Sequence, residues 1–427
     1  MRSPRRAFIR QAALAAGFTI VPRHVLGRGF IPPSETLNHV IVGCGGISKM
    51  HSSPRMTGAH RIVAVCDVDS KRAQAKHDEV SKAGGGTPVI AKDFRDVIAL
   101  PDADVVHVCT PPLWHGVIAA AAARRGKAVW CEKPLTRTIG EGLALRRVVE
   151  QTGVPFRVNT WFRLNRTNYY GVGPAREIRR VVASGVLGGP LTVRLAPVGG
   201  IQWKVNLWTG RPDLKPEPVP EHLDWDLYCG PSPLIPYHSH RAHGSFRGYW
   251  NFDQGGLGDM GQHFLDPVQY FLGKDREHPV AVECDAPPQD PVACGVWKTV
   301  TLTYKDGTRI ILESELAERR PDSPFIEGPK GKLFAGMRCD QPELLRKAAE
   351  YPLPEFQEDD FDLCAREKRP FGYGVSEAFF SSTLVNLAAL SVRLGRKLTF
   401  KSDGGGFVGD EQANRLHTPA FRGTWSI

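Results

Sequence analysis

Apolar runs alternate with segments of helical periodicity through the first third of the chain. One apolar run begins at His39, a second ends just before Asp67, and others cover residues 89–91, 104–109, 128–131 and 155–159. Between them, residues 70–83, 94–100, 116–125 and 139–152 read as helices. Strands that alternate with helices imply right-handed crossovers and a parallel sheet. We therefore predict a doubly wound α/β domain over residues 36–158, with a ligand crevice beyond the carboxyl ends of its strands.

The pattern of apolar and polar positions along the chain changes near residue 160. Long connections rich in proline and glycine separate alternating strands at 190–196, 297–304 and 308–315. The Asp306-Gly307 pair between the last two is a strong signal for an antiparallel hairpin. A late helix over 376–394 carries an apolar stripe. We predict that residues 159–427 form an α+β substrate-binding domain with a mostly antiparallel, open sheet.

A glycine turn joins the first apolar run to a short helix. Gly43 permits the sharp turn, and Gly45 lets the backbone approach a pyrophosphate over the helix N-terminus. Asp67, which lies 22 residues after Gly45, is placed to accept the hydroxyls of an adenosine ribose and to repel a 2′-phosphate. A purely structural turn is the alternative, but the flanking strand and helix favour a dinucleotide site that prefers NAD over NADP. Its predicted residues are Gly43, Gly45, Gly46, Ile47, Ser48 and Asp67.

Two chemical groups stand out beyond the turn. Lys133 directly follows a buried strand and precedes Pro134, so its ammonium is expected in the crevice, although a surface loop lysine is the alternative. Asp259 and His263 share one helix face, where the carboxylate could hold the imidazole and stabilise its charged form. An N-capping aspartate and a packed histidine would produce the same spacing.

Aromatic and histidine side chains are dense around the predicted site. Sugar rings stack on aromatic faces, but such residues are more often part of the core. The predicted substrate-binding residues are Trp161, Arg163, Tyr249 and Trp250. His238, His240 and His243 could bind a metal, yet no acid lies within the run, so we expect a polar loop and no metal site.

The net charge and the cysteine content limit the classes of protein to which this chain could belong. The chain has a net charge of +10, but six arginines precede the first acid, Glu35, and without them about +4 remains. No basic run with interleaved aromatics argues for nucleic acid. The early arginines, Phe8 and a short apolar stretch resemble a twin-arginine export signal over residues 1–30, rather than a disordered basic tail. Nine scattered cysteines without metal-like spacing argue against a disulfide framework.

Four motifs together resemble the Gfo/Idh/MocA oxidoreductases. They are the glycine turn at Gly43 to Ser48, Cys109-Thr110-Pro111 with His115, Glu132-Lys133-Pro134, and the segment Gly255 to Asp266. The resemblance implies a Rossmann domain that binds NAD, a catalytic role for Lys133, Asp259 and His263, and cofactor contacts from Thr110, Pro111, His115, Glu132 and Lys133. The Pro-rich segment from Trp208 to Pro236 looks like an exported branch of this family.

The leading hypothesis is NAD-dependent hydride transfer at a secondary hydroxyl of a sugar, polyol or glycoside. His263 would take the hydroxyl proton, Asp259 would orient His263, and Lys133 would polarise the oxygen. Export by the twin-arginine machinery to the periplasm, with the signal cleaved or kept as a tether, would require a tightly bound cofactor. That constraint suggests a glycosidase or lyase that oxidises its substrate transiently, without net redox change. A non-catalytic sugar-binding protein is the third possibility, and copies of the chain could pair through the second sheet.

Overall fold

A six-stranded parallel sheet forms the first domain. The computed structural model describes residues 35–53, 60–84, 86–160, 163, 168–197, 200–318, 320, 322–354 and 359–427. The strand order is β3-β2-β1-β4-β5-β6, and every neighbouring pair is parallel. The strands are β1 (Asn38–Val42), β2 (Arg61–Cys66), β3 (Val89–Ala91), β4 (Val105–Val108), β5 (Ala128–Glu132) and β6 (Phe156–Asn159). The predicted doubly wound Rossmann architecture is therefore confirmed.

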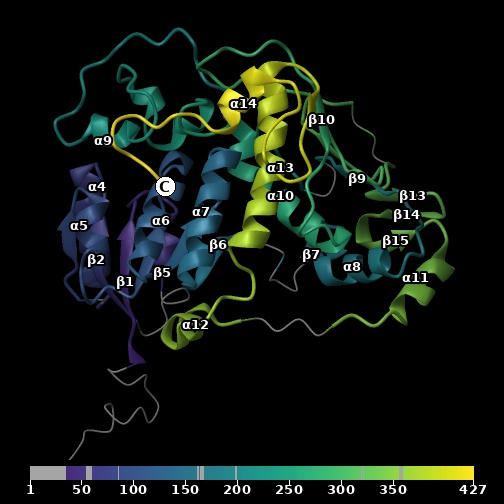
Figure 1. Cartoon of the computed structure of the whole chain (residues 1–427), viewed down its shortest axis with the longest axis horizontal. Coiled ribbons are helices and arrows are strands. Elements are labelled where there is room, and N and C mark those ends of the chain that lie inside the picture. Colours follow the sequence, from purple (N-terminus) through teal and green to yellow (C-terminus); the bar gives the residue numbers. More distant parts are fainter. Residues whose placement is uncertain are drawn as a thin grey trace, which may run out of the picture.

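Helices separate these strands and lie in front of and behind the sheet (Figure 1). Their limits follow local capping: Asp69 accepts hydrogen bonds from the first amides of α4, and left-handed Gly153 ends α7. The helices are α2 (Ser48–His51), α4 (Ser70–Lys82), α5 (Phe94–Ile98), α6 (His115–Arg124) and α7 (Ile139–Thr152). The export signal predicted for residues 1–30 lies outside the described residues.

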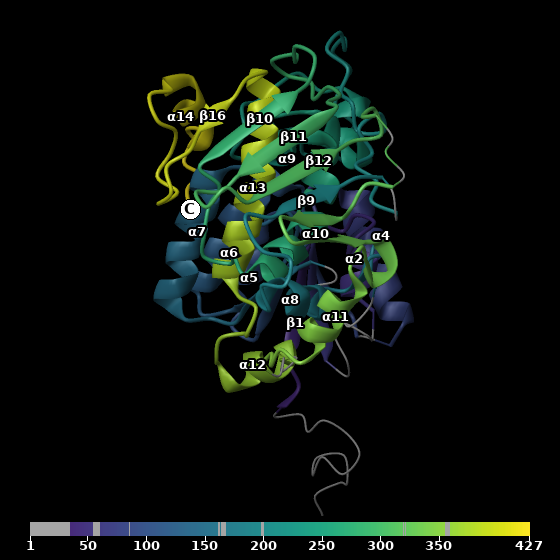
Figure 2. The same cartoon turned by 90° about the vertical axis from the view of Figure 1, so that its right-hand side faces the viewer.

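An eight-stranded sheet forms the second domain, in the order β15-β14-β13-β9-β12-β11-β10-β16. Its neighbours are antiparallel except for the parallel pair β9 and β12, as the expectation of a mostly antiparallel sheet requires. Figure 2 shows β10, β11 and β12 side by side, with α13 behind them. The strands are β9 (Thr192–Leu195), β10 (Ala281–Asp285), β11 (Thr299–Thr303), β12 (Arg309–Glu313), β13 (Ile326–Gly328), β14 (Gly331–Phe334), β15 (Arg338–Cys339) and β16 (Leu398–Thr399); β7 (Asn168–Tyr169) and β8 (Gly173–Pro174) form a separate pair.

Two long buried helices connect the domains. Helix α13 packs against α7 of the first domain as well as against α10 and β10 of the second. It is long and apolar enough to cross a membrane, but 94% of its most apolar window is buried inside the protein, as in a core helix. The helices of this domain are α8 (Ala175–Ala183), α9 (Trp225–Cys229), α10 (Gly255–Leu272), α11 (Pro342–Ala349), α12 (Phe361–Glu367), α13 (Val375–Leu394) and α14 (Glu411–His417).

A segment of the second domain and the C-terminal tail lie over the first domain (Figure 1). The Ser70 amide donates to the His222 carbonyl, and the Asp224 amide donates to the Val68 carbonyl. At the chain end, the Trp425 ring lies 4.8 Å from that of Trp114, measured between centroids. We call residues 222–231 the covering segment, because they close one side of the crevice described below.

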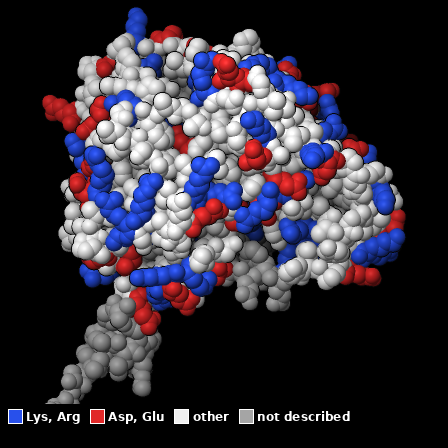
Figure 3. All heavy atoms as spheres, viewed as in Figure 1, with Lys and Arg blue, Asp and Glu red and all other residues white. Residues whose placement is uncertain are grey.

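The surface mixes both signs of charge, and the core holds most of the thiols. On the face drawn in Figure 3, acidic and basic side chains are interspersed. All nine cysteines are free thiols, and seven of them are buried.

Candidate active site

The glycine turn lines a cavity at the carboxyl ends of β1, β2 and β4. Gly43 has a φ of +93°, and a Cβ built there would lie 2.6 Å from the Cys109 carbonyl carbon, so only glycine fits. By contrast, a Cβ on Gly45 would meet only the Arg72 guanidinium, and one on Gly46 would meet nothing within 4 Å. The backbone of the turn is thus open to a ligand, as a pyrophosphate site requires.

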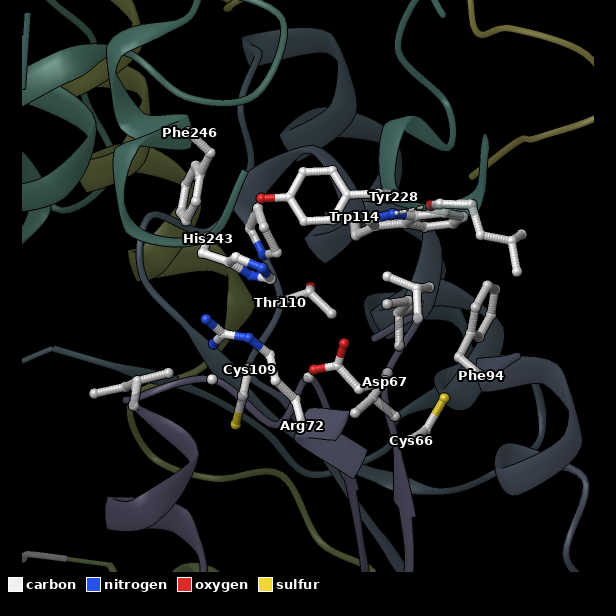
Figure 4. Close-up of a pocket in the computed structure, with 18 of the residues that line it drawn as sticks. Cys66, Asp67, Arg72, Phe94, Cys109, Thr110, Trp114, Tyr228, His243 and Phe246 are labelled. Atoms are coloured by element: carbon white, nitrogen blue, oxygen red, sulfur yellow. Dashed lines mark hydrogen bonds between the residues drawn. The ribbon is translucent and has the colours of Figure 1, made fainter. Parts of the chain in front are cut away.

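Asp67 lies at the centre of this cavity, beside Arg72 (Figure 4). One carboxylate oxygen accepts a 2.7 Å hydrogen bond from the Cys44 amide and the other a 2.9 Å bond from the Asp69 amide. Burial raises the pKa of Asp67 despite these two donors. The cavity measures about 320 Å³, within the usual range for small-molecule sites.

Both domains contribute to the cavity wall. Phe94 and Trp114 come from the first domain, and Tyr228 and Phe246 face them from the second (Figure 4). The Trp114 indole donates a 3.1 Å hydrogen bond to the carbonyl of Leu227 in the covering segment. The predicted residues Thr110 and Pro111 also line the cavity. The ligand volume is therefore completed only when the two domains meet.

Lys133 and Asp259 meet at the domain interface. Lys133 is the residue that directly follows β5. Its ammonium donates a 2.6 Å hydrogen bond to the Asp259 carbonyl and lies 3.4 Å from the Asp259 carboxylate. That carboxylate also lies 3.2 Å from the Lys204 ammonium and 3.0 Å from the Arg247 guanidinium. The Trp208 indole donates to it at 2.7 Å. Because Arg247 lines the cavity as well, this cluster continues the same site.

Burial and nearby charges act differently on the pKa values of Asp259 and His263, the two predicted partners on α10. Burial alone would raise the pKa of Asp259, but the charges of Lys133, Arg247 and Lys204 outweigh burial and hold it far below its usual range. Burial, reinforced by Lys133, lowers the pKa of His263 to about 3. The expectation that Asp259 keeps His263 charged is wrong, because desolvation and the nearby ammonium dominate. The imidazole is neutral at physiological pH.

Two residues predicted to contact the cofactor lie beneath the cavity instead of in its wall. His115 is fully buried, with Nδ1 2.7 Å from the Pro134 carbonyl oxygen and Nε2 2.8 Å from that of Thr110. Its ring therefore links the two motif loops. Glu132 is also buried and accepts 2.7 Å hydrogen bonds from His51 and Asn159. Burial disfavours its charge, but these donors and Lys133 lower its pKa to about 2.

The predicted substrate-binding residues belong to the core. The Arg163 guanidinium is buried and pairs with Asp266 at 2.9 Å and with Asp275 at 2.6 Å. Tyr249 is fully buried, and the Trp250 indole donates to a backbone carbonyl. The prediction fails for these three side chains, because sequence density does not reveal side-chain direction. Trp161 lies outside the described residues.

The three neighbouring histidines diverge to different partners. His238 lies 3.2 Å from Glu217, His240 lies 2.7 Å from the Tyr249 hydroxyl, and His243 lies 3.5 Å from Asp69. His243 lines the cavity, so this run contributes to the polar mouth that we expected.

Sequence reasoning missed the cations that converge on Asp259. Lys204 and Arg247 lie outside the regular helices and strands that periodicity can identify, and no motif marks them. Trp208 stood out only as one of many aromatic residues. Asp253 was also missed; burial raises its pKa to about 7. Its position just before the glycine-rich start of α10 was the one available signal.

Profiles of one protein family match nearly all of the chain after residue 36. A profile described as "Oxidoreductase family, NAD-binding Rossmann fold" matches residues 37–160. A second, described as "Oxidoreductase family, C-terminal alpha/beta domain", matches residues 172–427. Both bear the name GFO_IDH_MocA.

Curated relatives match a little over a third of the chain. An inositol 2-dehydrogenase from Burkholderia cenocepacia is 33% identical over 166 residues, which is 38% of this chain and 45% of that protein. A D-apiose dehydrogenase from Paraburkholderia graminis is 30% identical over 162 residues, 36% of this chain and 39% of that protein. The chain thus spans less than half the length of these relatives.

Solved structures share the whole fold. The WlbA dehydrogenase from Bordetella pertussis, in complex with NADH and UDP-GlcNAcA, aligns with a TM-score of 0.56 at 19% identity, over 86% of this chain and 98% of that one. A levoglucosan dehydrogenase, in complex with NADH and levoglucosan, aligns with a TM-score of 0.52 at 19% identity, over 85% of this chain and 99% of that one.

Proposed function

Because the chain belongs to the Gfo/Idh/MocA oxidoreductase family, we propose that it is an NAD-dependent enzyme that oxidises a secondary hydroxyl of a sugar, polyol or glycoside. The contact between Lys133 and Asp259 carries this proposal. It sets an ammonium from one domain against a charged helix of the other, beside a cavity that suits a dinucleotide. The relatives named as inositol and apiose dehydrogenases support a polyhydroxylated substrate.

The residues that would hold the cofactor follow from the cavity. The amides of Gly45 and Gly46 would face the pyrophosphate, and Asp67 would accept the ribose hydroxyls. Arg72 lies over the same turn and would add a positive charge. Bound there, NAD would supply the hydride acceptor. A carboxylate at position 67 favours NAD over NADP, since it would repel a 2′-phosphate.

The chain's own residues would handle the proton and the oxygen. The neutral His263 imidazole is in the form that can accept a hydroxyl proton. The Lys133 ammonium would donate a hydrogen bond to the substrate oxygen as it becomes a carbonyl. Asp259 would hold Lys133 in place, and Lys204 and Arg247 would keep Asp259 in its carboxylate form.

The covering segment supports a second candidate, a redox-neutral glycosidase or lyase. Asp224 pairs with Lys92 at 2.9 Å, and the Trp114 indole donates to the Leu227 carbonyl, so the segment is fastened over the cavity. A cofactor enclosed in this way would be retained between turnovers. A retained cofactor suits a cycle in which a ketone acidifies the adjacent C–H, the glycosidic group leaves, water adds, and the hydride returns to the substrate.

Export and self-association remain parts of the proposal. A twin-arginine signal would carry the folded protein, with its cofactor, to the periplasm. Pairing through the second sheet would use the outward side chains of β11, which are Thr299, Thr301 and Thr303. Light scattering measures the mass of the purified protein in solution and tests the pairing directly.

One preparation distinguishes the candidate functions. The purified protein is dialysed, its nicotinamide content is measured, and free sugars and chromogenic glycosides are then added. Accumulation of reduced nicotinamide with a free sugar supports the dehydrogenase. Aglycone release without that accumulation supports the glycosidase. The absence of both reactions, together with unchanged sugar binding by Lys133→Ala, would contradict an enzymatic function and support a binding protein.

A further inference from the structure

Three buried histidines form a continuous hydrogen-bonded line across the first sheet. His39 on β1 approaches His107 on β4, with 2.8 Å between Nδ1 and Nε2. The other nitrogen of His107 lies 2.8 Å from Nδ1 of His51 on α2. His51 Nε2 in turn lies 2.7 Å from a carboxylate oxygen of Glu132. All three rings have no exposed surface.

The inner end of this line determines which nitrogens carry protons. Glu132 is a carboxylate, because its pKa lies near 2, so His51 Nε2 must donate to it. The relay proposed below requires His51 to accept at Nδ1, so that His107 donates from its own Nδ1. His107 accepts at Nε2, which makes His39 the donor through Nδ1. The three N–H bonds therefore all point toward Glu132.

Asp362 on α12 lies near the outer end of the line, but within the described part of the chain it makes no hydrogen bond to His39. A proton transfer between them therefore requires the carboxyl to approach His39 Nε2. Nε2 of His39 accepts no hydrogen bond from any described residue, although it is buried. Ligating atoms of His39, His60 and Asp362 lie within 4.8 Å of one another. The Asp362 side chain is 18% exposed, so this carboxyl can exchange protons with solvent.

These three groups could suggest a metal site, but the hydrogen bonding of His60 argues against one. The Leu37 amide donates a 2.8 Å hydrogen bond to His60 Nδ1. A neutral His60 therefore carries its proton on Nε2, the atom that a metal would need. That N–H instead points toward Asp362, 3.6 Å away.

We propose that His39, His107 and His51 form a proton relay that connects Asp362 at the surface with Glu132 beneath the active site. We call these three residues the histidine relay. This inference rests on the proposed function, because the relay carries a proton between solvent and Glu132, the residue that precedes Lys133. Glu132 precedes Lys133 in the chain and accepts a hydrogen bond from the Lys133 amide. Its charge also acts on His263, so the inner end adjoins the predicted catalytic groups.

Each proton transfer in the relay breaks one bond to hydrogen and forms another. The Asp362 carboxyl gives its proton to His39 Nε2, and His39 passes the proton on Nδ1 to His107 Nε2. His107 then gives its Nδ1 proton to His51 Nδ1, and His51 gives its Nε2 proton to the Glu132 carboxylate. Four bonds to hydrogen break and four form, without oxidation or reduction. Asp362 then takes a proton from water, and the reverse sequence carries a proton from Glu132 to solvent.

The surroundings of Asp362 suit a proton entrance. Burial and the neighbouring Asp360 raise the pKa of Asp362 to about 6, while Arg366 and Arg157 oppose that shift. His60, which directly precedes β2, faces the same carboxyl. The group therefore exchanges protons readily near neutral pH.

Imidazole protonation provides the first test, and it requires neither substrate nor cofactor. In protein labelled with ¹⁵N at histidine, we expect N–H protons at Nδ1 of His39 and His107 and at Nε2 of His51. We also expect scalar couplings through the two N···N hydrogen bonds. A proton on Nε2 of His107, or a doubly protonated His107, would overturn the relay.

Exchange of the buried N–H protons with solvent is the decisive measurement. We expect Asp362→Asn to slow exchange at His51 and His107 by about tenfold or more, with backbone amide exchange in β1 and β4 unchanged. The matched control is Asp359→Asn, which alters a nearby carboxylate that pairs with Arg369 and is not among the charges that shift the pKa of Asp362. Equal imidazole exchange in both variants would overturn the proposal. Neither result depends on the proposed activity, which the nicotinamide assay tests separately.

Discussion

The Lys133 ammonium donates a 2.6 Å hydrogen bond to the backbone carbonyl of Asp259, and this bond joins the two domains at the candidate active site. Lys133 follows a strand of the first domain, whereas Asp259 lies in the first turns of α10 in the second. A small rotation between the domains would therefore separate the two groups.

Replacing Lys133 by methionine should abolish most of the proposed activity. The substitution keeps the side-chain length but removes the hydrogen-bond donor, and we expect turnover to fall about 10²- to 10⁴-fold. Retained nicotinamide and the melting temperature should change little. The control is Lys82→Met on the exposed end of α4, and equal turnover by the two variants would refute a catalytic role for Lys133.

Asp67→Ala should shift cofactor preference toward NADP. The variant removes both the ribose acceptor and the charge that repels a 2′-phosphate, while Arg72 remains nearby. We expect NAD to bind about tenfold more weakly and NADP more tightly, as measured by titration of cofactor-free protein. If NAD and NADP both bind more weakly to the variant, Asp67 only supports the turn, through the hydrogen bond that it accepts from the Cys44 amide.

Acidification should destabilise the protein through its buried histidines. The pKa lies near 3 for His39 and near 4 for His278, against 6.5 in the unfolded chain. Below pH 6.5 the unfolded state takes up protons that the folded state cannot, so stability is lost as the pH falls toward 4. The loss is about 1.4 kcal/mol per pH unit for each such histidine.

Substitution of one of these histidines measures this contribution. His278 stacks on Phe380, with 4.4 Å between ring centroids. Between pH 7 and pH 4.5, we expect the free energy of unfolding of His278→Phe to fall by about 2 kcal/mol less than that of the unmodified protein. Chemical denaturation at each pH measures this free energy. Identical losses would show that this imidazole does not titrate as described.

Removing the C-terminal tail should release the cofactor. Trp425 packs on Trp114, and Arg422 pairs with Asp226 of the covering segment, so the tail reinforces the cavity wall. Deletion of residues 419–427 should speed the loss of nicotinamide during dialysis at least several-fold. The conservative variant Trp425→Phe serves as a control. If the deletion leaves retention unchanged, the covering segment alone closes the cavity.

Arg163→Met should act on stability and leave substrate binding intact. The change leaves Asp266 buried without its 2.9 Å partner, which typically costs about 3–5 kcal/mol. The KM for whichever sugar is accepted should stay the same in the protein that folds. A raised KM with normal stability would restore the original expectation that Arg163 contacts substrate.

Local patterns were sufficient to predict the framework of the fold. Alternating apolar runs predicted the parallel sheet. The limits predicted for helix α7 match those in the structure, where Thr138 and Gly153 cap its two ends. The glycine turn was recognisable because only glycine tolerates the contact at Gly43.

Convergence of distant residues was not predictable from the same patterns. Lys204 and Trp208 reach Asp259 from one turn and Arg247 from a separate 3-10 helix, and spacing along the chain contains no information about that meeting. Side-chain direction was equally hidden, so Tyr249 was assigned to the substrate although it is buried. One signal was overlooked: His107 is the single polar residue of β4, and His39 is a polar residue beside the apolar run of β1.

Burial shields most of the protein's thiols from oxidants in solution. Seven of the nine cysteines are shielded from solvent, and burial raises the pKa of thiols such as Cys66 and Cys131, so little reactive thiolate forms. Oxidants such as peroxide would reach chiefly the two half-buried sulfurs, Cys284 and Cys339. The seven buried thiols would therefore remain unmodified in reducing and in oxidising surroundings alike.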